Sequence, residues 1–375
     1  MQDYGAGGLE LDGPVTTSPL MGSPAVGILT FHRCINYGSY WQARCLAEGL
    51  EARGLSVELL DHDCAEVRRS EYRCALRPTL PEPTPARHRA AYKAKARAFE
   101  PAFDALPLSR RFSLHDASDL PAYDAVVVGS DEVWNLAHPW YSHKPLFYGE
   151  GLKTGRLASY AASFGNHDAA NGLDSFWSDK LARFSAISVR DYNSRALVSD
   201  ALGQEPPLVL DPCLQFADRI PRDPAEEERP YALVYGHGFP DWLGATARAW
   251  AASRGLALLS VGYGCDFADE ERIGVGPLDF ARLVAGSQAV ITNFFHGCVF
   301  ALVMGKPFVV TPTPYRLNKV RDLTAKLAAD RHLLREAPDP ATFAALLASA
   351  PEPQVEQRIQ DLRRSSTAYL DAALA

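Results

Sequence analysis

The segment TNFFHG at 292–297 places the imidazole of His296 between an expected strand and an expected apolar helix. Helix N-terminal N–H groups lie beside such a turn, and their dipole would disfavour the imidazolium and poise the ring as an acid or base near neutrality. The same position also suits a histidine that only caps a helix or bonds within the core. The local sequence supports both interpretations of His296.

Three basic residues follow expected strands and could bind an anion. Arg190 ends the strand expected at 186–190, and Arg316 and Lys319 follow the strand expected at 308–310. Guanidinium groups suit carboxylate and phosphate oxygens because their planar fork bonds two oxygens at once. Any one of these residues could equally form a surface salt bridge. Together they predict an anion site between two domains.

The loop NYGS at 36–39 joins the first expected strand to the first expected helix, so N–H groups of that helix N-terminus should face the same cleft. The chain has no G-x-G-x-x-G, G-x-x-x-x-G-K-[ST] or G-x-S-x-G motif, which disfavours nicotinamide, P-loop and α/β-hydrolase chemistry. It also has no H-E-x-x-H or C-x-x-C spacing, so we expect no metal site.

Short apolar runs alternate with segments of helical periodicity along the chain. The expected strands are at 25–30, 56–61, 123–129, 156–162, 186–190, 231–235, 257–261, 289–292 and 308–310, with helices at 38–53, 242–253, 278–285 and 299–304. Open α/β sheets bind ligands at the carboxyl ends of their strands. We therefore predict an α/β fold with two Rossmann-like αβα domains facing a cleft.

The length of 375 residues exceeds what one compact core usually holds. We expect a disordered leader at 1–24, an N-terminal domain at 25–204 with a helical insertion near 78–115, a C-terminal domain at 205–345, and a helix within 346–375 that packs back on the first domain. The leader has no Lys or Arg and no long apolar stretch, unlike a signal peptide. The apolar run at 298–304 is too short to cross a bilayer.

The balance of 38 basic against 45 acidic residues gives a net charge of −7, which disfavours binding to a long nucleic acid. The hydrophobic share of 47% excludes a disordered chain, and seven scattered cysteines favour a reducing cytosol. Five cations, Arg87, Arg89, Lys93, Lys95 and Arg97, lie on an alanine-rich helical background. Their face could contact an anionic carrier or a membrane surface, although a plain solvated helix face is the favoured interpretation.

Six segments occur in an order typical of one enzyme family. They are GILTFHRCINYGSYWQA (27–43), VVVGSDEVWN (126–135), SYAASFG (159–165), SVRD (188–191), VLDPCL (209–214) and TNFFHGCVFALVMGKPF (292–308). With these segments the chain resembles the polysaccharide pyruvyl transferase family. The resemblance implies a GT-B-like fold and transfer of the enolpyruvyl unit of phosphoenolpyruvate onto two hydroxyls of a sugar in a glycan or glycan precursor. The products would be a cyclic ketal and phosphate, with no cofactor or metal.

The resemblance also implies roles for residues of this chain. His296 would be the catalytic acid or base, and Arg190 would bind the phosphate or carboxylate of the donor. The expected substrate-binding residues are Asn36, Gly38, Ser39, Ser130, Asp131, Asn135, Ser163, Arg316 and Lys319. Relatives usually have Gln where this chain has Glu132, and Ser where it has Phe294, so these two positions should shape contacts to donor or acceptor.

The resemblance implies phosphoenolpyruvate and a saccharide acceptor as partners. The acceptor could be free or lipid-linked. Such acceptors are built at the inner face of the membrane, so the expected location is the cytoplasm, with residues 87–97 as a membrane contact. Three alternatives stay open. They are a sugar-nucleotide-dependent GT-B glycosyltransferase, pyruvyl transfer to a small natural product or peptide, and a non-catalytic relative that binds its ligand without turnover.

Overall fold

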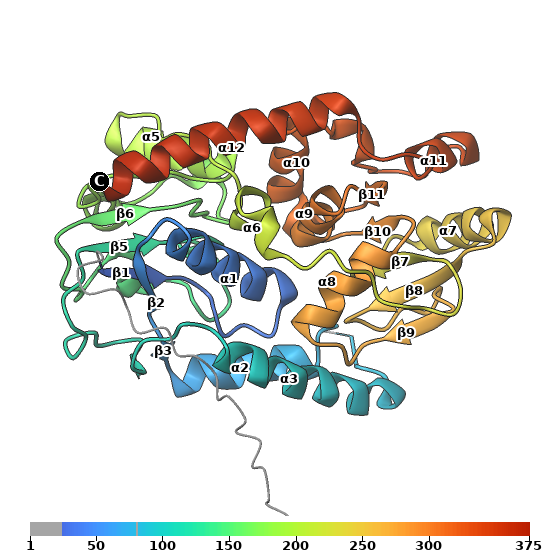
Figure 1. Ribbon diagram of the computed structural model, residues 1–375, viewed down its shortest axis with the longest axis horizontal. Coiled ribbons are helices and arrows are strands. Elements are labelled where there is room, and N and C mark those ends of the chain that lie inside the picture. The colour runs from blue at the N-terminus through green and yellow to red at the C-terminus, as the bar shows by residue number, and fades with distance from the viewer. Residues whose placement is uncertain (1–24, 80–81) are drawn as a thin grey trace, which may run out of the picture.

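The computed structural model describes residues 25–79 and 82–375, so the leader expected at 1–24 lies outside the described residues. The N-terminal half holds a parallel sheet with the strand order β2-β1-β5-β6 (Figure 1). Its strands are β1 (Ala25–Leu29), β2 (Ser56–Leu59), β5 (Ala125–Val128) and β6 (Leu157–Ser159). The short strands β3 (His62–Asp63) and β4 (Phe112–Ser113) pair beside it.

The C-terminal half holds a second parallel sheet with the strand order β11-β10-β7-β8-β9. Its strands are β7 (Tyr231–Tyr235), β8 (Ala257–Val261), β9 (Glu270–Arg272), β10 (Val290–Thr292) and β11 (Phe308–Val310). Every residue of β7 and β8 is buried, as expected of parallel strands covered on both faces. Two such sheets confirm the predicted fold class, an α/β protein of two Rossmann-like domains in a GT-B-like arrangement.

Helices connect and cover the strands in both halves. Up to residue 204 they are α1 (Tyr37–Glu51), α2 (Ala65–Leu76), α3 (Arg89–Asp104), α4 (Ser175–Leu181) and α5 (Tyr192–Leu202). Those that follow are α6 (Pro212–Gln215), α7 (Asp241–Arg254), α8 (Pro277–Gly286), α9 (Phe295–Val303), α10 (Leu317–Lys326), α11 (Pro340–Leu346) and α12 (Pro353–Leu374). Among the described residues, no helix is both long and apolar enough to cross a bilayer.

Helix α1 joins the two halves. Asn36 caps it, because its Oδ1 accepts hydrogen bonds from the N–H groups of Gly38 (2.9 Å) and Ser39 (3.3 Å). The ring of Tyr37 stacks on Phe280 of α8 with centroids 4.2 Å apart, and the indole N–H of Trp41 donates to the Pro277 carbonyl at 3.0 Å. One hydrophobic core therefore continues from the first half into the second.

Two predicted elements differ in the structure. The strand expected at 186–190 is reduced to isolated bridges, at Ala186 and Val189. Side-chain hydrogen bonds take the place of the backbone hydrogen bonds of a strand here. Ser159 Oγ donates to the Ser188 carbonyl (3.0 Å), and Ser188 Oγ donates to the Ser159 carbonyl (3.1 Å). Helix α9 begins at 295 and not at 299, so the predicted catalytic histidine lies in its first turn.

Helices α2 and α3 form an arm that leaves the first half at residue 65, earlier than the insertion expected near 78–115. The arm runs below both sheets in Figure 1 and packs on the C-terminal half. Tyr92 Oη accepts from the N–H of Gly264 at 3.0 Å, and Arg87 pairs with Asp266 at 2.7 Å. Lys95 is 3% exposed. Of the five cations expected on a solvated face, Arg87, Arg89, Lys93 and Arg97 are exposed, and the expectation is wrong for Lys95, which points inward.

Helix α12 runs back along the top of the molecule from α11 to the first half (Figure 1). Tyr369 Oη donates to the Ser159 carbonyl at 2.6 Å, and Ser366 Oγ accepts from the N–H of Leu210 at 2.9 Å. These contacts tie the end of the chain to the edge of the first sheet, where the ladder beyond β6 is irregular.

Candidate active site

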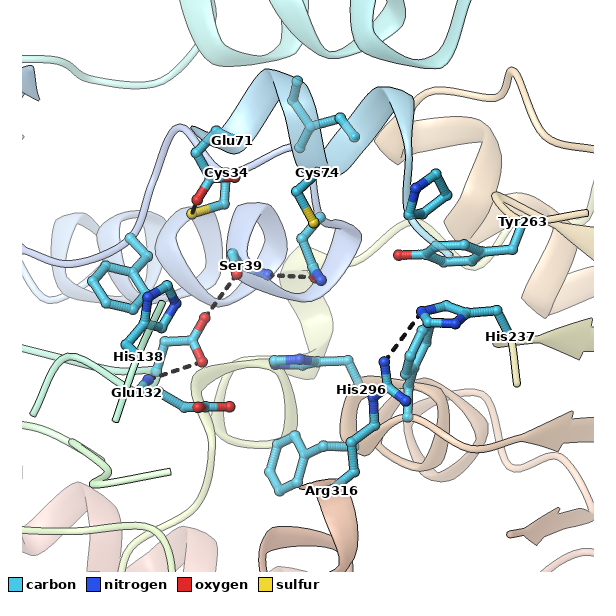
Figure 2. A pocket seen from close by; sticks show the side chains of 18 of the residues that line it. Cys34, Ser39, Glu71, Cys74, Glu132, His138, His237, Tyr263, His296 and Arg316 are labelled. Carbon is cyan, nitrogen blue, oxygen red and sulfur yellow. Dashed lines mark hydrogen bonds between the residues drawn. The ribbon is translucent and has the colours of Figure 1, made fainter. Parts of the chain in front are cut away.

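A pocket of about 240 Å³ lies between the two halves, at the carboxyl ends of strands from both sheets. Asn36 follows β1, Asp131 follows β5, His237 follows β7 and His296 follows β10. In each sheet these strands flank the point where the strand order reverses, which is where open α/β sheets place ligands. Figure 2 shows side chains from both halves turned toward this space.

His296 stands on the pocket wall with a buried carboxylate behind it. Its Nε2 lies 3.5 Å from Oδ2 of Asp211, which is 1% exposed. Oδ1 of Asp211 caps α6 by accepting from the N–H of Cys213 at 3.0 Å, so the carboxylate is fixed. Burial alone would raise the pKa of Asp211, but His296 and Arg190 hold it below its usual value. A histidine held by a fixed carboxylate is suited to proton transfer.

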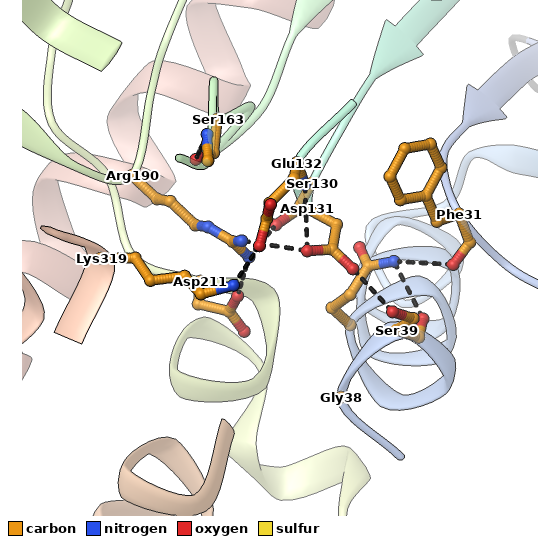
Figure 3. Close-up of polar contacts among 12 residues, drawn as sticks. Phe31, Gly38, Ser39, Ser130, Asp131, Glu132, Ser163, Arg190, Asp211 and Lys319 are labelled. Atoms are coloured by element: carbon orange, nitrogen blue, oxygen red, sulfur yellow. Dashed lines mark hydrogen bonds and ion pairs between the residues drawn. The ribbon is translucent and has the colours of Figure 1, made fainter. Parts of the chain in front are cut away.

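Arg190 lies beneath the pocket and does not line it. Its Nη1 donates to Asp211 Oδ2 at 2.9 Å and its Nη2 to Asp131 Oδ1 at 3.0 Å, and the side chain is 1% exposed (Figure 3). Asp131 in turn accepts from Ser39 Oγ at 2.8 Å. The expectation that Arg190 binds the donor directly is corrected here, because the guanidinium is buried outside the pocket and each of its amino groups donates to a buried carboxylate. Arg190 instead positions the carboxylate behind His296.

Glu132 and Lys319 form an ion pair across the pocket. Burial would raise the pKa of the Glu132 carboxyl, but Lys319 lowers it to about 2. Oε2 of Glu132 also accepts from Nδ2 of Asn135 at 2.8 Å. The unusual acidic residue therefore neutralises one of the cations predicted to bind an anion, and it fixes Lys319 on the wall.

Arg316 has no carboxylate partner within the described residues. Its Nη2 lies 3.2 Å from Nε2 of His237, its Nη1 lies 3.2 Å from Thr313 Oγ1, and its guanidinium stacks 4.4 Å above the ring of Phe294. Burial, and then the charge of Arg316, lower the pKa of His237 to about 4, so this ring is neutral. Phe294 thus provides an aromatic platform that supports the Arg316 guanidinium on the pocket wall.

Three predicted substrate-binding residues do not reach the pocket. Ser130 and Ser163 are fully buried, and the Oγ of Ser163 accepts from the N–H of Gly165 at 2.9 Å. Asn135 is 2% exposed and its Nδ2 donates to Glu132 and to Asn166. The prediction that these three residues bind substrate is corrected here, because their polar atoms hold the loops after β5 and β6. Asn36, Ser39, Asp131, Arg316, Lys319 and His296 do line the pocket, and Gly38 packs against the His296 ring.

Several residues of the site were not predicted from the sequence. Asp211, behind the pocket wall, lies within the segment VLDPCL (209–214), where Asp before Pro is a common helix-cap signal that could have identified it. His237 follows a strand directly, which is the same signal that identified His296. Glu71 and Lys95 come from the helical arm, and no local pattern connects that arm to the pocket.

Asp211, Cys213 and His296 carry potential metal-ligand atoms within 4.8 Å of one another. The Oδ2 atom of Asp211 already accepts from the Arg190 guanidinium at 2.9 Å. A metal cation at this carboxylate would be repelled by that positive charge. The donor set is therefore better suited to hold the histidine than to hold an ion.

Solved structures with a similar course of the chain include an epimerase and a glycosyltransferase. Three of these structures are the UDP-GlcNAc 2-epimerase of Methanocaldococcus jannaschii (TM-score 0.45, 12% identity, covering 92% of this chain and 99% of that one), S. aureus MnaA with UDP (0.45, 10%, 92% and 97%) and the glycosyltransferase SnogD of Streptomyces nogalater (0.39, 16%, 94% and 100%). No curated protein matches the chain at a significant level.

The model of the polysaccharide pyruvyl transferase family matches residues 36–313. The match begins at the residue that caps α1, ends just before Arg316, and includes His296 and the carboxylate behind it. Because the match covers most of the chain, this protein belongs to the polysaccharide pyruvyl transferase family.

Proposed function

We propose that this protein transfers the pyruvyl unit of phosphoenolpyruvate onto two hydroxyls of a saccharide acceptor. Membership of the family supports a transferase that acts on polysaccharides. The observation that carries the proposal is a single pocket in which the free guanidinium of Arg316 and the carboxylate-backed imidazole of His296 both face the same space. The first suits an anionic donor, and the second suits the proton transfers that ketal formation needs.

In the proposed reaction, one sugar hydroxyl attacks C2 of phosphoenolpyruvate and gives up its proton, while C3 gains a proton and becomes a methyl group. The bond between C2 and the phosphate oxygen then breaks as the second hydroxyl bonds to C2. Phosphate leaves with the proton of that second hydroxyl, so the atoms balance without oxidation or reduction. We assign proton transfer to His296 and charge stabilisation of the donor to Arg316.

We further propose a cytoplasmic reaction with no resident cofactor, on an acceptor that is either free or lipid-linked. All seven cysteines are free thiols, as is usual in a reducing compartment. Tyr315 lies on the pocket with 46% of its surface exposed, and its ring offers an amphipathic platform for the acceptor sugar.

Replacing Arg316 with glutamine should weaken phosphoenolpyruvate binding about 10- to 100-fold, since a hydrogen bond to a charged group contributes roughly 1.5–3 kcal/mol. Titration calorimetry measures this directly, with UDP titrated in parallel. Arg321→Gln is the matched control, because Arg321 lies on α10 and pairs with its neighbour Asp322 at 3.1 Å. Equal affinity in both variants would contradict donor binding by Arg316.

The same titration separates the alternatives. Tighter binding of UDP than of phosphoenolpyruvate would favour the alternative function, a sugar-nucleotide-dependent glycosyltransferase. Saturable phosphoenolpyruvate binding without turnover on any saccharide would favour a natural-product or peptide acceptor, or a relative that binds without catalysis.

Gly38→Ala should lower kcat about 10- to 100-fold, because small displacements of catalytic groups have effects of this size. A Cβ at this position would lie 1.9 Å from Nδ1 of His296, so the ring must move. Gly49→Ala is the control on the same helix, since its Cβ would lie 2.5 Å from Phe216 and away from the pocket. The control should lower the thermal midpoint and keep kcat. A Gly38→Ala enzyme with normal kcat would show that the position of His296 is not critical.

A further inference from the structure

Lys95 is a buried cation whose charge nothing in the described part of the chain neutralises. It lies on α3 of the helical arm, is 3% exposed and lines the pocket. Its Nζ donates to the Gly262 carbonyl at 3.0 Å and lies 4.2 Å from the ring centre of Tyr263 and 4.8 Å from that of Tyr37. A buried ammonium is costly without an anionic partner, and two of its three N–H donors remain for a ligand.

The other free cation of the pocket lies on the same side. Arg316 contacts His237, and the His237 ring packs on Tyr263 with centroids 5.1 Å apart, which leads to Lys95. Figure 2 shows His237 and Tyr263 together on this side, and Glu132 on the opposite side. Lys95 and Arg316 therefore form a cationic wall of the pocket, while the opposite side carries the Glu132–Lys319 ion pair.

We propose that Lys95 is a second ligand for the anionic groups of the donor, and that donor binding is coupled to protonation of this residue. The proposal rests on the proposed function, since phosphoenolpyruvate carries a carboxylate and a phosphate close together. Two cations on one wall can hold both groups, whereas the cation on the opposite side, Lys319, is already paired with Glu132. The helical arm thereby contributes a donor-binding residue from the first half to a subsite built on the second.

Lys95 is the group of the cationic wall whose charge changes near neutral pH. Burial lowers its pKa to about 7. The groups that face Lys95 keep their charge state between pH 7 and 8.5, because burial raises the pKa values of Cys74, Tyr37 and Tyr263, lowers that of His237 to about 4, and leaves Arg316 charged. Glu71 lines the same pocket and burial raises its pKa to about 7, so the proton uptake that is lost in Lys95→Met is the part that belongs to Lys95. A bound anion favours the ammonium form, so binding above pH 7 takes up a proton.

Calorimetric titration of the full-length protein with phosphoenolpyruvate at pH 8, in two buffers of different ionisation enthalpy, counts this proton. The phosphate of the donor is fully ionised at pH 8, so it neither gains nor loses a proton. We expect uptake close to one proton, and an affinity that falls up to about tenfold per pH unit above pH 7.

The Lys95→Met variant should take up far less than one proton when it binds phosphoenolpyruvate at pH 8. At pH 7 it should bind phosphoenolpyruvate about 10- to 100-fold more weakly than the unmodified protein. Lys93→Met is the matched control, because Lys93 is exposed on the same helix and should behave as the unmodified protein. Removing an unpaired buried charge should leave the thermal midpoint of Lys95→Met equal or higher, so weaker binding would not reflect unfolding. Lys95→Arg keeps a charge that does not titrate, and should bind without proton uptake.

Equal affinity and equal proton uptake in Lys95→Met and the unmodified protein would overturn the role of Lys95 and leave the proposed function intact. Absence of phosphoenolpyruvate binding to the unmodified protein would instead refute the proposed function. In that case sulfate, whose charge is constant over this pH range, tests the anion subsite alone. Sulfate binding that is lost in Lys95→Met supports the subsite, and sulfate binding that is unchanged or absent overturns it.

Discussion

His296→Ala is expected to lower kcat for pyruvyl transfer by about 10²- to 10⁴-fold, the usual contribution of a positioned acid or base. The donor affinity should change little, because the cations that hold the donor are elsewhere on the pocket wall. The expectation follows from the pairing of His296 with Asp211, whose buried carboxylate favours an imidazole that gains a proton during the reaction. Steady-state rates combined with calorimetric titration separate the two effects.

His167→Ala is the control for this variant. His167 is partly buried outside the pocket, where its Nε2 lies 3.0 Å from the Gly172 carbonyl. Its removal tests whether loss of any buried histidine lowers the rate through general loosening. A His296→Ala enzyme that retains kcat within about threefold would remove His296 from the proton-transfer step.

The strands could be predicted because parallel strands covered on both faces are short apolar runs, as in AVVV of β5 and ALLSV of β8. The strand expected at 186–190 fits the same pattern but does not form. There the serines Ser159 and Ser188 bond across to backbone carbonyls, which a pattern of apolar residues does not reveal. Apolar periodicity therefore locates the sheets, and side-chain hydrogen bonds decide where each ladder ends.

The candidate site also has features that the sequence predicts and features that it does not. His296 and Arg316 each follow a strand end, so the topology brings them together, and their types and order were sufficient to predict a site between the two halves. Asp131 was expected only from the resemblance to the family. The pairing of charges was not predictable, because it depends on which side chains meet after folding. Arg190 is used by two aspartates, and Lys95 reaches the pocket only because its arm packs on the opposite half.

Within the described chain, the cations of the site thus serve three different purposes. Arg190 is a buried positioning residue, Lys319 is neutralised by Glu132, and Arg316 with Lys95 remains available to an anion. An anion site inferred from basic residues alone would include all of them. Only the carboxylate partners of each residue separate a ligand from a structural ion pair.

Arg190→Met should destabilise the fold by about 3–5 kcal/mol at pH 7, because removing one partner of a buried network leaves the other charges unpaired. Asp131 and Asp211 would both lose their guanidinium, and Asp211 is 1% exposed. Urea unfolding measures the difference. Arg183→Met is the matched control, since Arg183 pairs with Glu150 at an exposed site and its loss should cost less than about 1 kcal/mol.

The loss of stability in Arg190→Met should depend on pH. The pKa of Asp211 is lowered in the folded protein, so its ion pairing stabilises the fold above the unfolded pKa of about 4, and that stability is lost as the pH falls below this value. Without Arg190 the carboxyl should protonate at a higher pH, which removes the unpaired charge. The difference in unfolding free energy between Arg190→Met and the unmodified protein should therefore decrease as the pH is lowered from 7 to 4.5. The corresponding difference for Arg183→Met should stay small throughout. A deficit that is small at pH 7, or that grows on acidification, would contradict a network in which Arg190 neutralises the carboxylates beneath the pocket.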